Sequence, residues 1–374
     1  MTTARNLSHL AHNKQLPDHV KLRVAEEDHR VKNLIGSDRT RRILIVGGSG
    51  YVGVPLTTQL LRSGYEVRNL DLHIYENKSS ALCNIGHPNY DFVFGDLCAT
   101  ETLDQALDGV TDVVLLAGLV GDPITRKYPT ESCQINESGI QRCIDHLNGR
   151  GLNKVVFVST CSNYGLIPDG ETADEEHELT PLSLYAKAKV AAETYILSQR
   201  GVVDYNPTIL RFATAFGLAP RMRFDLTVNE FTRELALGNR LDVYDADTWR
   251  PYCHVSDFSS AIQRVLEFPV SDVSFETFNV GGNDNNITKR GLVDILRTRF
   301  PNSDVVFSTN STDPRNYKVN FSKIRSKLFF NPSYSIDTGI DEIIWAFKSN
   351  LFNGTPTTVN QYGNYQLDYK PPYD

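Results

Sequence analysis

The chain has 374 residues, 40% hydrophobic and 22% charged, a composition typical of a soluble globular protein with a large core and two lobes. The formal net charge of -7 and the pI near 5.8 argue against a general nucleic-acid binder or a membrane-surface binder. No apolar run reaches the ~18 residues of a membrane span, and the N-terminus lacks the hydrophobic core of a signal peptide. We therefore expect a cytoplasmic protein that binds neither nucleic acid nor membrane.

The cysteines and histidines carry no metal-binding pattern. The six cysteines are scattered without a CxxC pair, and the nine histidines form no HExxH motif. We therefore predict reduced thiols and no catalytic metal.

The first predicted elements follow a polar N-terminal extension. Residues 1–40 are mixed in charge and only partly periodic, so we place them outside the main fold, with a helix around residues 20–33. The apolar run "RRILIVGG" from Arg41 then predicts a buried parallel strand. The stretch "VGVPLTTQLLRSG" has helical spacing and ends at Gly64.

Strands and helices then alternate as far as residue 212. Strands are predicted at "YEVRNLDL", "DFVFGDL", "DVVLLAG", "KVVFVST" and residues 208–212, and helices at residues 101–109, 129–148 and 183–200. This alternation implies an α/β fold with a doubly wound parallel sheet.

The regular pattern loosens after Gly217. We assign residues 41–217 to a dinucleotide-binding domain and residues 218–352 mainly to a smaller α/β substrate lobe, with segments that return to the first domain. Residues 353–374 are rich in Asn, Gly, Pro and Tyr, which predicts an irregular or partner-draped tail.

A glycine-rich turn joins the first strand to its helix. In "VGGSGYVG", Gly47, Gly50 and Gly53 permit a tight turn and let backbone N–H groups approach a pyrophosphate at the helix N-terminus. Tyr51 and Val52 lie within the same turn. The sequence therefore predicts a dinucleotide site here.

Two acids further along would border the dinucleotide. Asp71 ends the second strand, 24 residues after Gly47, and can accept both ribose hydroxyls of NAD while repelling the 2′-phosphate of NADP. Its alternative role is to cap the next turn. Asp96 and Leu97 follow the third strand and could border the adenine, although Asp96 fits a helix N-cap nearly as well.

A Tyr-x-x-x-Lys pair follows the fifth strand. Tyr185 and Lys189 share a helix face, so the ammonium can favour the phenolate of Tyr185. A surface Tyr–Lys pair is the alternative. The pair begins 25 residues after Thr160, which ends the strand before "CSNYG", and this placement favours a catalytic role.

Together these motifs resemble the extended short-chain dehydrogenase/reductase family of nucleotide-sugar epimerases and dehydratases. The resemblance covers roughly residues 41–350 and implies a Rossmann domain that binds NAD. It implies that Tyr185 is the acid/base, that Thr160 hydrogen-bonds the reacting sugar oxygen, and that Lys189 holds the nicotinamide ribose.

The resemblance also implies the remaining site residues. The segment beneath the cofactor corresponds to Leu116, Ala117 and Gly118, and the asparagine on the following helix to Asn136. The candidate contacts to a nucleotide-diphosphate sugar are Asp122, Ser162, Asn163, Thr214, Arg221, Arg223, Arg250 and Arg315. Arg250 resembles the arginine that clamps the substrate pyrophosphate, whereas a loop acid is the alternative for Asp122, and a solvated surface pair is the alternative for Arg221 and Arg223.

One departure from the family pattern bears on the reaction. The 4,6-dehydratases carry an acidic pair after the catalytic Thr, whereas this chain has Cys161 and Ser162. Neither is a carboxylate, so water elimination lacks its usual proton donors. We interpret Cys161 as a packed thiol and Ser162 as a sugar contact.

These observations predict an NAD-dependent nucleotide-sugar epimerase that oxidises a sugar hydroxyl transiently and returns the hydride. A ketosugar reductase or sugar dehydrogenase on the same site is the alternative. A non-catalytic dinucleotide sensor fits less well, because Thr160, Tyr185 and Lys189 are all present. The resemblance implies a homodimer.

Overall fold

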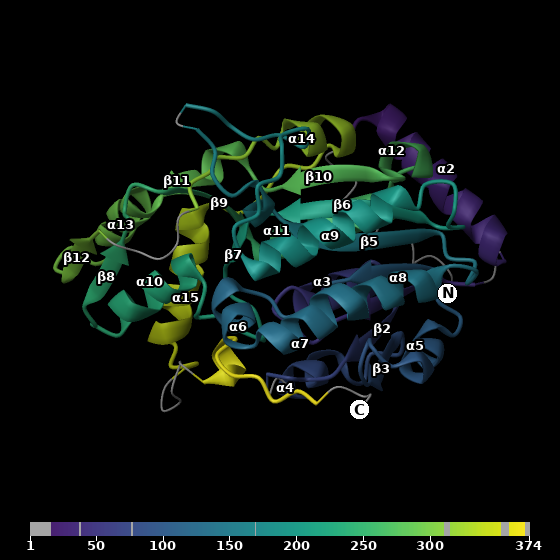
Figure 1. Ribbon diagram of the computed structural model, residues 1–374, viewed down its shortest axis with the longest axis horizontal. Coiled ribbons are helices and arrows are strands. Elements are labelled where there is room, and N and C mark those ends of the chain that lie inside the picture. Colours follow the sequence, from purple (N-terminus) through teal and green to yellow (C-terminus); the bar gives the residue numbers. More distant parts are fainter. Residues whose placement is uncertain are drawn as a thin grey trace, which may run out of the picture.

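The computed structural model describes residues 16–36, 39–75, 78–168, 170–309, 315–352 and 359–370. Its centre is a seven-stranded parallel sheet in the order β10-β6-β5-β4-β1-β2-β3 (Figure 1). The strands are β1 (Arg42–Val46), β2 (Glu66–Asp71), β3 (Tyr90–Phe94), β4 (Asp112–Leu115), β5 (Lys154–Thr160), β6 (Asn206–Phe212) and β10 (Glu276–Val280). The predicted doubly wound sheet is confirmed.

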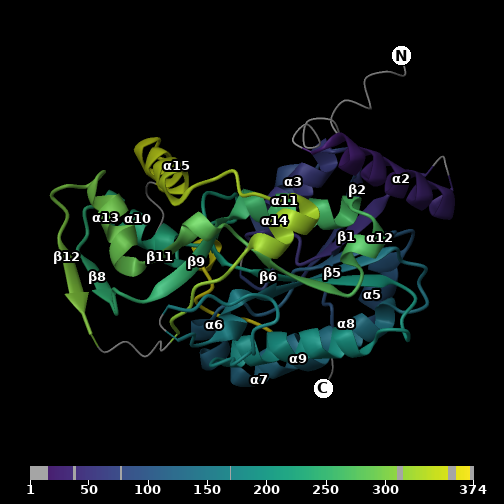
Figure 2. The same cartoon turned by 90° about the horizontal axis from the view of Figure 1, so that it is seen from above.

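Helices cover both faces of this sheet. Figure 2 shows α2, α3, α11, α12 and α14 on one side and α5, α7, α8 and α9 on the other. Their bounds are α2 (Asp18–Ile35), α3 (Gly53–Arg62), α5 (Thr100–Leu107), α7 (Pro129–Cys133), α8 (Ile140–Leu147), α9 (Leu184–Ser198), α11 (Val255–Glu267), α12 (Val270–Val273) and α14 (Ser322–Leu328). The short elements α4 (Lys78–Ala81) and η1 (Leu82–Asn84) precede β3, and α6 (Asp122–Lys127) follows β4.

Strand β1 shows how the sequence divides between the two layers. Its side chains alternate, so Ile43 and Ile45 join one buried cluster while Leu44 and Val46 join the other. A strand that is apolar on both faces must be covered on both, which is why "RILIV" lies in the middle of the sheet.

The N-terminal helix packs on the main fold. We expected a helix around residues 20–33 and α2 confirms it, but its placement outside the main fold is wrong. Val20 and Val24 belong to the same buried cluster as residues of α3 and α11, and Val31 is fully buried. The buried residues of α2 are Val20, Val24, Glu27 and Val31. They recur every three to four residues, so one face of the helix is buried. Residues 1–15 lie outside the described residues.

The helix predicted over residues 129–148 is divided into three parts. A π-helix, η2 (Gln134–Gly139), separates α7 from α8. Within it, the Asn136 amide clamps Leu119: its Oδ1 accepts from the Leu119 N–H at 2.8 Å and its Nδ2 donates to the Leu119 carbonyl at 3.0 Å. π-Helical turns commonly occur where a helix serves a site, and here the turn fixes the loop after β4.

The C-terminal lobe holds two small sheets and the helices around them. One sheet has the order β11-β9-β7 and the other pairs β12 with β8. The elements are β7 (Thr214–Phe216), α10 (Thr227–Ala236), β8 (Leu241–Tyr244), β9 (Trp249–His254), η4 (Asn283–Asn285), β11 (Asn286–Thr288), α13 (Lys289–Arg297), β12 (Val305–Ser308) and α15 (Ile336–Lys348). Strand β10 and helix α14 return to the large sheet (Figure 1).

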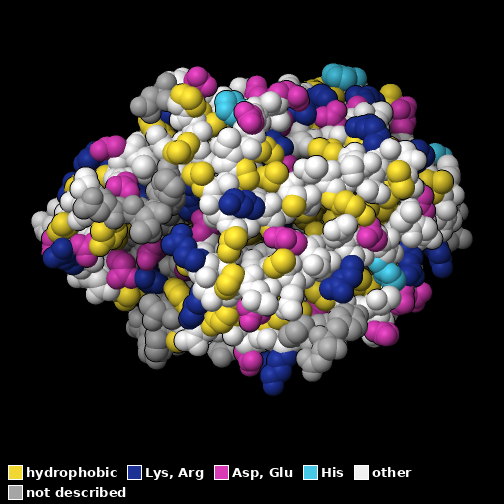
Figure 3. Space-filling view, in the orientation of Figure 1, with side chains coloured by type: hydrophobic (Ala, Val, Ile, Leu, Met, Phe, Trp, Pro, Cys, Tyr) yellow, Lys and Arg dark blue, Asp and Glu magenta, His cyan; other side chains and the backbone are white. Residues whose placement is uncertain are grey.

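Charges of both signs are mixed over the surface seen in Figure 3. Lys and Arg side chains lie among Asp and Glu side chains on this face, in keeping with the modest net charge. Within the described ranges, no helix combines the length and apolar character that crossing a bilayer requires.

Buried charges hold α2 against the amino ends of β4 and β5. Arg41 binds Asp112 through two hydrogen bonds of 2.8 and 3.1 Å, and both side chains are almost inaccessible. The Lys154 ammonium lies 3.5 Å from Glu27 of α2 and donates to the carbonyl of Leu266 at 2.8 Å. Although burial favours the neutral carboxyl, Arg41 holds the pKa of Asp112 below its usual value.

Removing one partner from this buried cluster should cost stability. Asp112→Asn leaves the Arg41 guanidinium buried without a counter-charge, so we expect the free energy of unfolding to fall by about 3 to 5 kcal/mol. Urea denaturation of wild-type and variant proteins measures the change.

The exposed pair Arg240–Asp242 supplies the control. Its charges lie at the surface, so Asp242→Asn should have little effect. Equal losses in the two variants would contradict a special role for the buried pair.

Candidate active site

A cavity of about 470 Å³ opens at the carboxyl ends of the parallel strands. Strands β1 and β4 lie side by side, but the chain turns from β1 toward β2 on one side and from β4 toward β5 on the other. Such a switch point leaves a crevice where open α/β sheets bind ligands. The loops after β1, β4 and β5 all line it.

The structure brings most predicted site residues to this one cavity. Those that line it are Gly47, Gly50, Tyr51, Val52, Gly53, Asp71, Asp96, Leu97, Leu116, Ala117, Gly118, Asp122, Thr160, Ser162, Tyr185, Lys189, Thr214, Arg221, Arg223, Arg250 and Arg315. Their roles as cofactor or substrate contacts stay predictions.

The glycine turn has the shape of a phosphate cradle. Gly47 has φ +89°, and a Cβ atom there would lie 2.7 Å from the backbone nitrogen of Ala117. A Cβ on Gly53 would lie 2.5 Å from the carbonyl oxygen of Gly48. Only glycine fits at both positions, and the turn leads directly into α3, so the residues present suit a dinucleotide pyrophosphate.

Both acids near the turn also cap backbone groups. Asp71 accepts from the N–H of Ser49 at 2.9 Å and from the N–H of His73 at 2.8 Å while lining the cavity. Asp96 accepts from the N–H of Cys98 at 2.8 Å. Capping and ligand binding are therefore compatible at these positions, because each carboxylate oxygen can accept more than one hydrogen bond.

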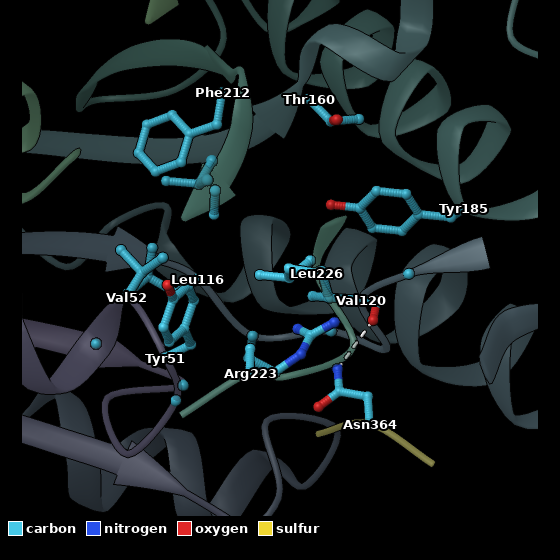
Figure 4. Close-up of a pocket in the computed structure, with 18 of the residues that line it drawn as sticks. Tyr51, Val52, Leu116, Val120, Thr160, Tyr185, Phe212, Arg223, Leu226 and Asn364 are labelled. Atoms are coloured by element: carbon cyan, nitrogen blue, oxygen red, sulfur yellow. Dashed lines mark hydrogen bonds between the residues drawn. The ribbon is translucent and has the colours of Figure 1, made fainter. Parts of the chain in front are cut away.

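Helix α9 presents Tyr185 and Lys189 on its cavity side. The Ser183 hydroxyl caps the helix by accepting from the N–H of Ala186 at 3.2 Å, which places Tyr185 in the first turn. The Lys189 ammonium lies 6.0 Å from the centroid of the Tyr185 ring and donates to the carbonyl of Val158 at 2.8 Å. In Figure 4 the Tyr185 hydroxyl points toward the middle of the cavity.

Thr160 lies on the same side of the cavity as Tyr185 (Figure 4). It is the last residue of β5, and its Oγ1 accepts from the N–H of Ser162 at 3.1 Å, at the start of η3 (Cys161–Tyr164). This bond turns the chain sharply and leaves the hydroxyl proton of Thr160 available to another acceptor.

Burial shifts the pKa values of both Tyr185 and Lys189. Burial raises the pKa of Tyr185, the nearby Asp122 raises it further, and Arg223 opposes the shift. Burial lowers the pKa of Lys189 to about 8, while the Glu193 carboxylate partly opposes this shift. Both shifts have the same main cause, because removal of water disfavours the charged form of either side chain.

Basic side chains also line the cavity, each with a partner that orients it. Arg223 forms a two-pronged pair with Asp225, with both contacts at 2.6 Å. The Arg250 guanidinium lies 5.3 Å from the centroid of the Tyr317 ring. Arg315 pairs with Asp122 at 2.6 Å, across the floor of the same cavity.

The motif between β1 and α3 also connects to the C-terminal lobe. The Tyr51 hydroxyl donates to the carbonyl of Gly217 and accepts from Asn229 of α10 at 3.0 Å. A substituent on Gly217 would clash with His254, at 2.1 Å from its Nε2. The turn and the lobe are thus held in one arrangement around the cavity.

A profile of the family described as "NAD dependent epimerase/dehydratase family" matches residues 43–281 of the chain. The match covers well over half of the protein, including the glycine turn, Thr160, Tyr185 and Lys189. The chain belongs to this family.

Relatives within the NAD-dependent epimerase/dehydratase family differ in the reaction that they carry out. The chain is 27% identical over 319 residues to dTDP-glucose 4,6-dehydratase of Streptomyces niveus, covering 83% of this chain and 93% of that one. It is 25% identical to UDP-glucose 4-epimerase of Corynebacterium glutamicum, covering 83% and 96%. UDP-glucuronic acid decarboxylases match at similar identity.

The fold matches solved structures of the same kind. UDP-glucuronic acid 4-epimerase from Bacillus cereus, solved with UDP-glucuronic acid and NAD, superposes with a TM-score of 0.75 at 21% identity. The match covers 82% of this chain and 99% of the epimerase. At that identity the likeness establishes the Rossmann fold.

Two residues that were predicted to contact a ligand, Asn136 and Asn163, do not line the cavity and hydrogen-bond other parts of the protein. Asn163 is fully buried, and its amide donates to Glu193 at 2.8 Å and to Ser159 at 3.1 Å. Asn136 clamps Leu119 as described above. Neither side chain lines the cavity in this structure, since the amide nitrogen of each donates to a buried partner, and direct contact with a ligand stays a prediction for both.

Arg221 lines the cavity, but its hydrogen bonds go to the C-terminal segment, residues 359–370. Its Nη2 donates to the carbonyl of Gly363 at 3.0 Å and to the Asn364 side chain at 2.8 Å. Burial, with Arg223 nearby, lowers the pKa of Arg221 to about 10. The alternative of a solvated surface pair is excluded, since Arg221 and Arg223 are both buried.

Several cavity residues were not predicted from the sequence. Those with polar or aromatic side chains are Tyr75, Ser159, Phe212, Asp225, Thr227, Phe258, Lys289, Tyr317, Asn364 and Tyr369. Tyr317 follows Arg315 by two residues, and its hydroxyl lies 3.2 Å from the Ser162 Oγ. Tyr317, Asn364 and Tyr369 all lie beyond residue 281, where the family profile ends.

Among the described residues, no group of three or more His, Cys, Asp or Glu side chains could hold a metal ion.

The shifted pKa of Lys189 makes stability depend on pH in protein without a bound ligand. In the unfolded chain the ammonium has its ordinary pKa of 10.5, so between about pH 8 and 10.5 the unfolded state binds more protons. The free energy of unfolding should therefore rise with pH across this window, by up to about 3 kcal/mol from this group. Urea denaturation as a function of pH should show a smaller rise in Lys189→Met than in wild-type protein.

Lys187 provides the control on the same helix. Its side chain is exposed, so Lys187→Met should keep the wild-type rise. Equal pH dependence in wild-type and Lys189→Met proteins would contradict the low pKa of Lys189.

Proposed function

We propose that the protein is an NAD-dependent nucleotide-sugar epimerase. The observation that carries this proposal is the arrangement of one cavity, with the glycine turn at one end and Thr160, Tyr185 and Lys189 at the other. Membership of the NAD-dependent epimerase/dehydratase family supports the cofactor. The homodimer and the cytoplasmic location stay predictions from the sequence.

The cofactor contacts follow from the geometry of the turn. Backbone N–H groups after Gly47 would bind the NAD pyrophosphate at the start of α3, and Asp71 would accept from the adenosine ribose. Lys189 would bind the nicotinamide ribose from α9. When bound, NAD accepts and returns the hydride, and the protein supplies orientation and proton transfer.

Proton transfer is the part played by the protein's own side chains. Tyr185 would take the proton of a sugar hydroxyl at its phenolic oxygen, while the Thr160 hydroxyl hydrogen-bonds the same sugar oxygen. Because burial raises the pKa of Tyr185, the phenolate needs nearby positive charge; Arg223 opposes the shift, and the Lys189 ammonium, 6.0 Å from the ring centroid, would add to it. Return of the proton restores the starting state of both groups.

The substrate would lie beside the arginine side chains that line the cavity. Arg223 and Arg250 suit a diphosphate, because a guanidinium can donate two parallel hydrogen bonds to phosphate oxygens. Asp122 would bind the sugar: its Oδ2 pairs with Arg315, and its buried Oδ1 has no partner among the described residues. A buried acceptor left without a donor is costly, and a sugar hydroxyl would satisfy it.

The residues after Thr160 favour epimerisation over water elimination. The Cys161 thiol is buried and donates to the carbonyl of Arg211 at 3.2 Å, and burial raises its pKa well above the ordinary value. Ser162 has no charge, and Asp122, an acid of the cavity, pairs with Arg315. The chain is similar over most of its length to a dTDP-glucose 4,6-dehydratase, but the acid pair of the 4,6-dehydratases is absent here.

Tyr185→Phe tests the proposed proton transfer. Turnover of the accepted UDP- or dTDP-sugar should fall by ~10² to 10⁴, the usual contribution of a positioned acid/base. NAD content should stay unchanged, because the substitution leaves the glycine turn and Lys189 in place. Interconversion of sugar epimers is followed by chromatography, and NADH by absorbance.

Tyr195 on the same helix supplies the control. Its hydroxyl donates to Asp145 at the surface, so Tyr195→Phe should keep wild-type turnover. Wild-type activity in Tyr185→Phe would contradict the assignment. Stoichiometric production or consumption of NADH would instead favour the sugar dehydrogenase or ketosugar reductase.

Asp71→Ser tests the ribose contact. Loss of hydrogen bonds to a charged acceptor should weaken NAD binding about 10- to 100-fold and reduce the preference for NAD over NADP. Calorimetric titration with each dinucleotide measures both effects. The control is Asp91→Ser, which removes an exposed carboxylate on β3 that pairs with Arg68 of β2. Unchanged affinity in Asp71→Ser would contradict the contact.

A further inference from the structure

The C-terminal segment, residues 359–370, passes along the edge of the cavity. Its first part is η5 (Asn360–Tyr362), where the Tyr362 carbonyl accepts from the N–H of Phe224 at 2.7 Å. In Figure 1 the yellow chain then runs below α6 toward α4. Asn364 and Tyr369 both line the cavity, so the segment forms part of its wall.

A buried arginine anchors the start of this segment. The Arg221 guanidinium donates to the carbonyls of Asn360 and Gly363 and to the Asn364 side chain. Asn364 in turn donates to the carbonyl of Val120 at 2.9 Å, a bond drawn in Figure 4. The loop after β4 and the loop after β7 are therefore both tied to the segment.

The far end of the segment reaches the predicted adenine end of the cavity. The Tyr369 hydroxyl donates to Asp96 Oδ2 at 2.9 Å. Leu367 and the Tyr369 ring pack against a small buried cluster that includes Leu119 and Ile124. Between these two ends, the Lys127 ammonium of α6 donates to the carbonyl of Tyr365 at 3.2 Å.

We propose that residues 359–370 act as a strap that closes the dinucleotide site and slows the release of NAD. This inference rests on the proposed function, because a cofactor that regains its starting oxidation state in every cycle need not leave. The strap joins the loops on both sides of the dinucleotide site, so release would require either Asn364 and Tyr369 to detach or the cofactor to pass between them.

The strap lines the site without filling it. With Asn364 and Tyr369 in place, the cavity keeps its volume of about 470 Å³ and extends from Gly47 to Thr160. A segment that occupied the adenine position would instead compete with NAD. The two possibilities predict opposite effects of removing the strap.

The experiment removes residues 364–374 by a stop after Gly363 and, separately, replaces Tyr369 by Phe. The truncation leaves the anchoring carbonyls of Asn360 and Gly363 in place. Protein is loaded with NAD, excess NAD is removed, and release into buffer is followed by chromatography of free NAD. We expect release to be at least about tenfold faster after truncation and several-fold faster in Tyr369→Phe. The truncation removes the hydrogen bond from Arg221 to the Asn364 side chain, and Tyr369→Phe removes the hydrogen bond from Tyr369 to Asp96.

Gln366→Ala is the matched control, because its exposed side chain belongs to the strap but does not line the cavity. It should release NAD at the wild-type rate. Tyr369→Phe retains the ring and its packing, so it tests the strap even where the truncated protein folds poorly. Wild-type release rates in both altered proteins, or tighter NAD binding after truncation, would overturn the strap.

The outcome separates the strap from the proposed reaction. NAD-loaded protein that converts no nucleotide sugar but releases NAD faster without the strap would overturn the epimerase and leave the strap standing. Wild-type protein that takes up no NAD would overturn the cofactor assignment and the strap together.

Discussion

The site depends on the parallel pairing of β1 with β4 at the centre of the sheet. Parallel pairing brings the carboxyl ends of both strands to one edge, and the Gly47 turn then passes so close to Ala117 that a single Cβ atom would not fit. Because β5 is next in the sheet, Thr160 reaches the same edge. Every later feature of the cavity is arranged around this junction, and a shift of one strand would separate the glycine turn from Thr160.

Burial of its ionisable side chains gives the site its electrostatic character. Burial disfavours the phenolate of Tyr185 and the ammonium of Lys189 alike, so each responds strongly to the charges that a ligand brings. The same burial requires partners for the arginines, and Asp225 and the C-terminal segment provide them. The hydrogen bond from Arg221 to the C-terminal segment and the Arg223–Asp225 pair thus both follow from the burial of charged side chains.

The sheet and the meeting of Thr160, Tyr185 and Lys189 at one cavity could be predicted because their signals are local. A run such as "RILIV" predicts a strand by itself, and a Tyr and a Lys four residues apart share a helix face wherever the helix lies. The position of α2 could not be predicted, since its polar sequence has only a narrow valine stripe and its buried Glu27 is matched by Lys154, more than a hundred residues away. The buried partner of Asn163 is Glu193 on α9, 30 residues further along the chain, and no local pattern indicates that pairing.

The sequence by itself determined the doubly wound fold and the glycine turn, because short-range spacing decides strands, helices and tight turns. It also singled out Thr160, Tyr185 and Lys189 as candidate site residues. Only the tertiary structure decided which polar side chains face the cavity and which face the protein. It pairs Arg223 with Asp225 while Arg221, two residues earlier, binds the C-terminal segment, and it brings Asn364 and Tyr369 to a site built some 250 residues earlier in the chain. The physical reason is that burial and pairing of polar groups depend on contacts between distant segments, which no local pattern of residues specifies.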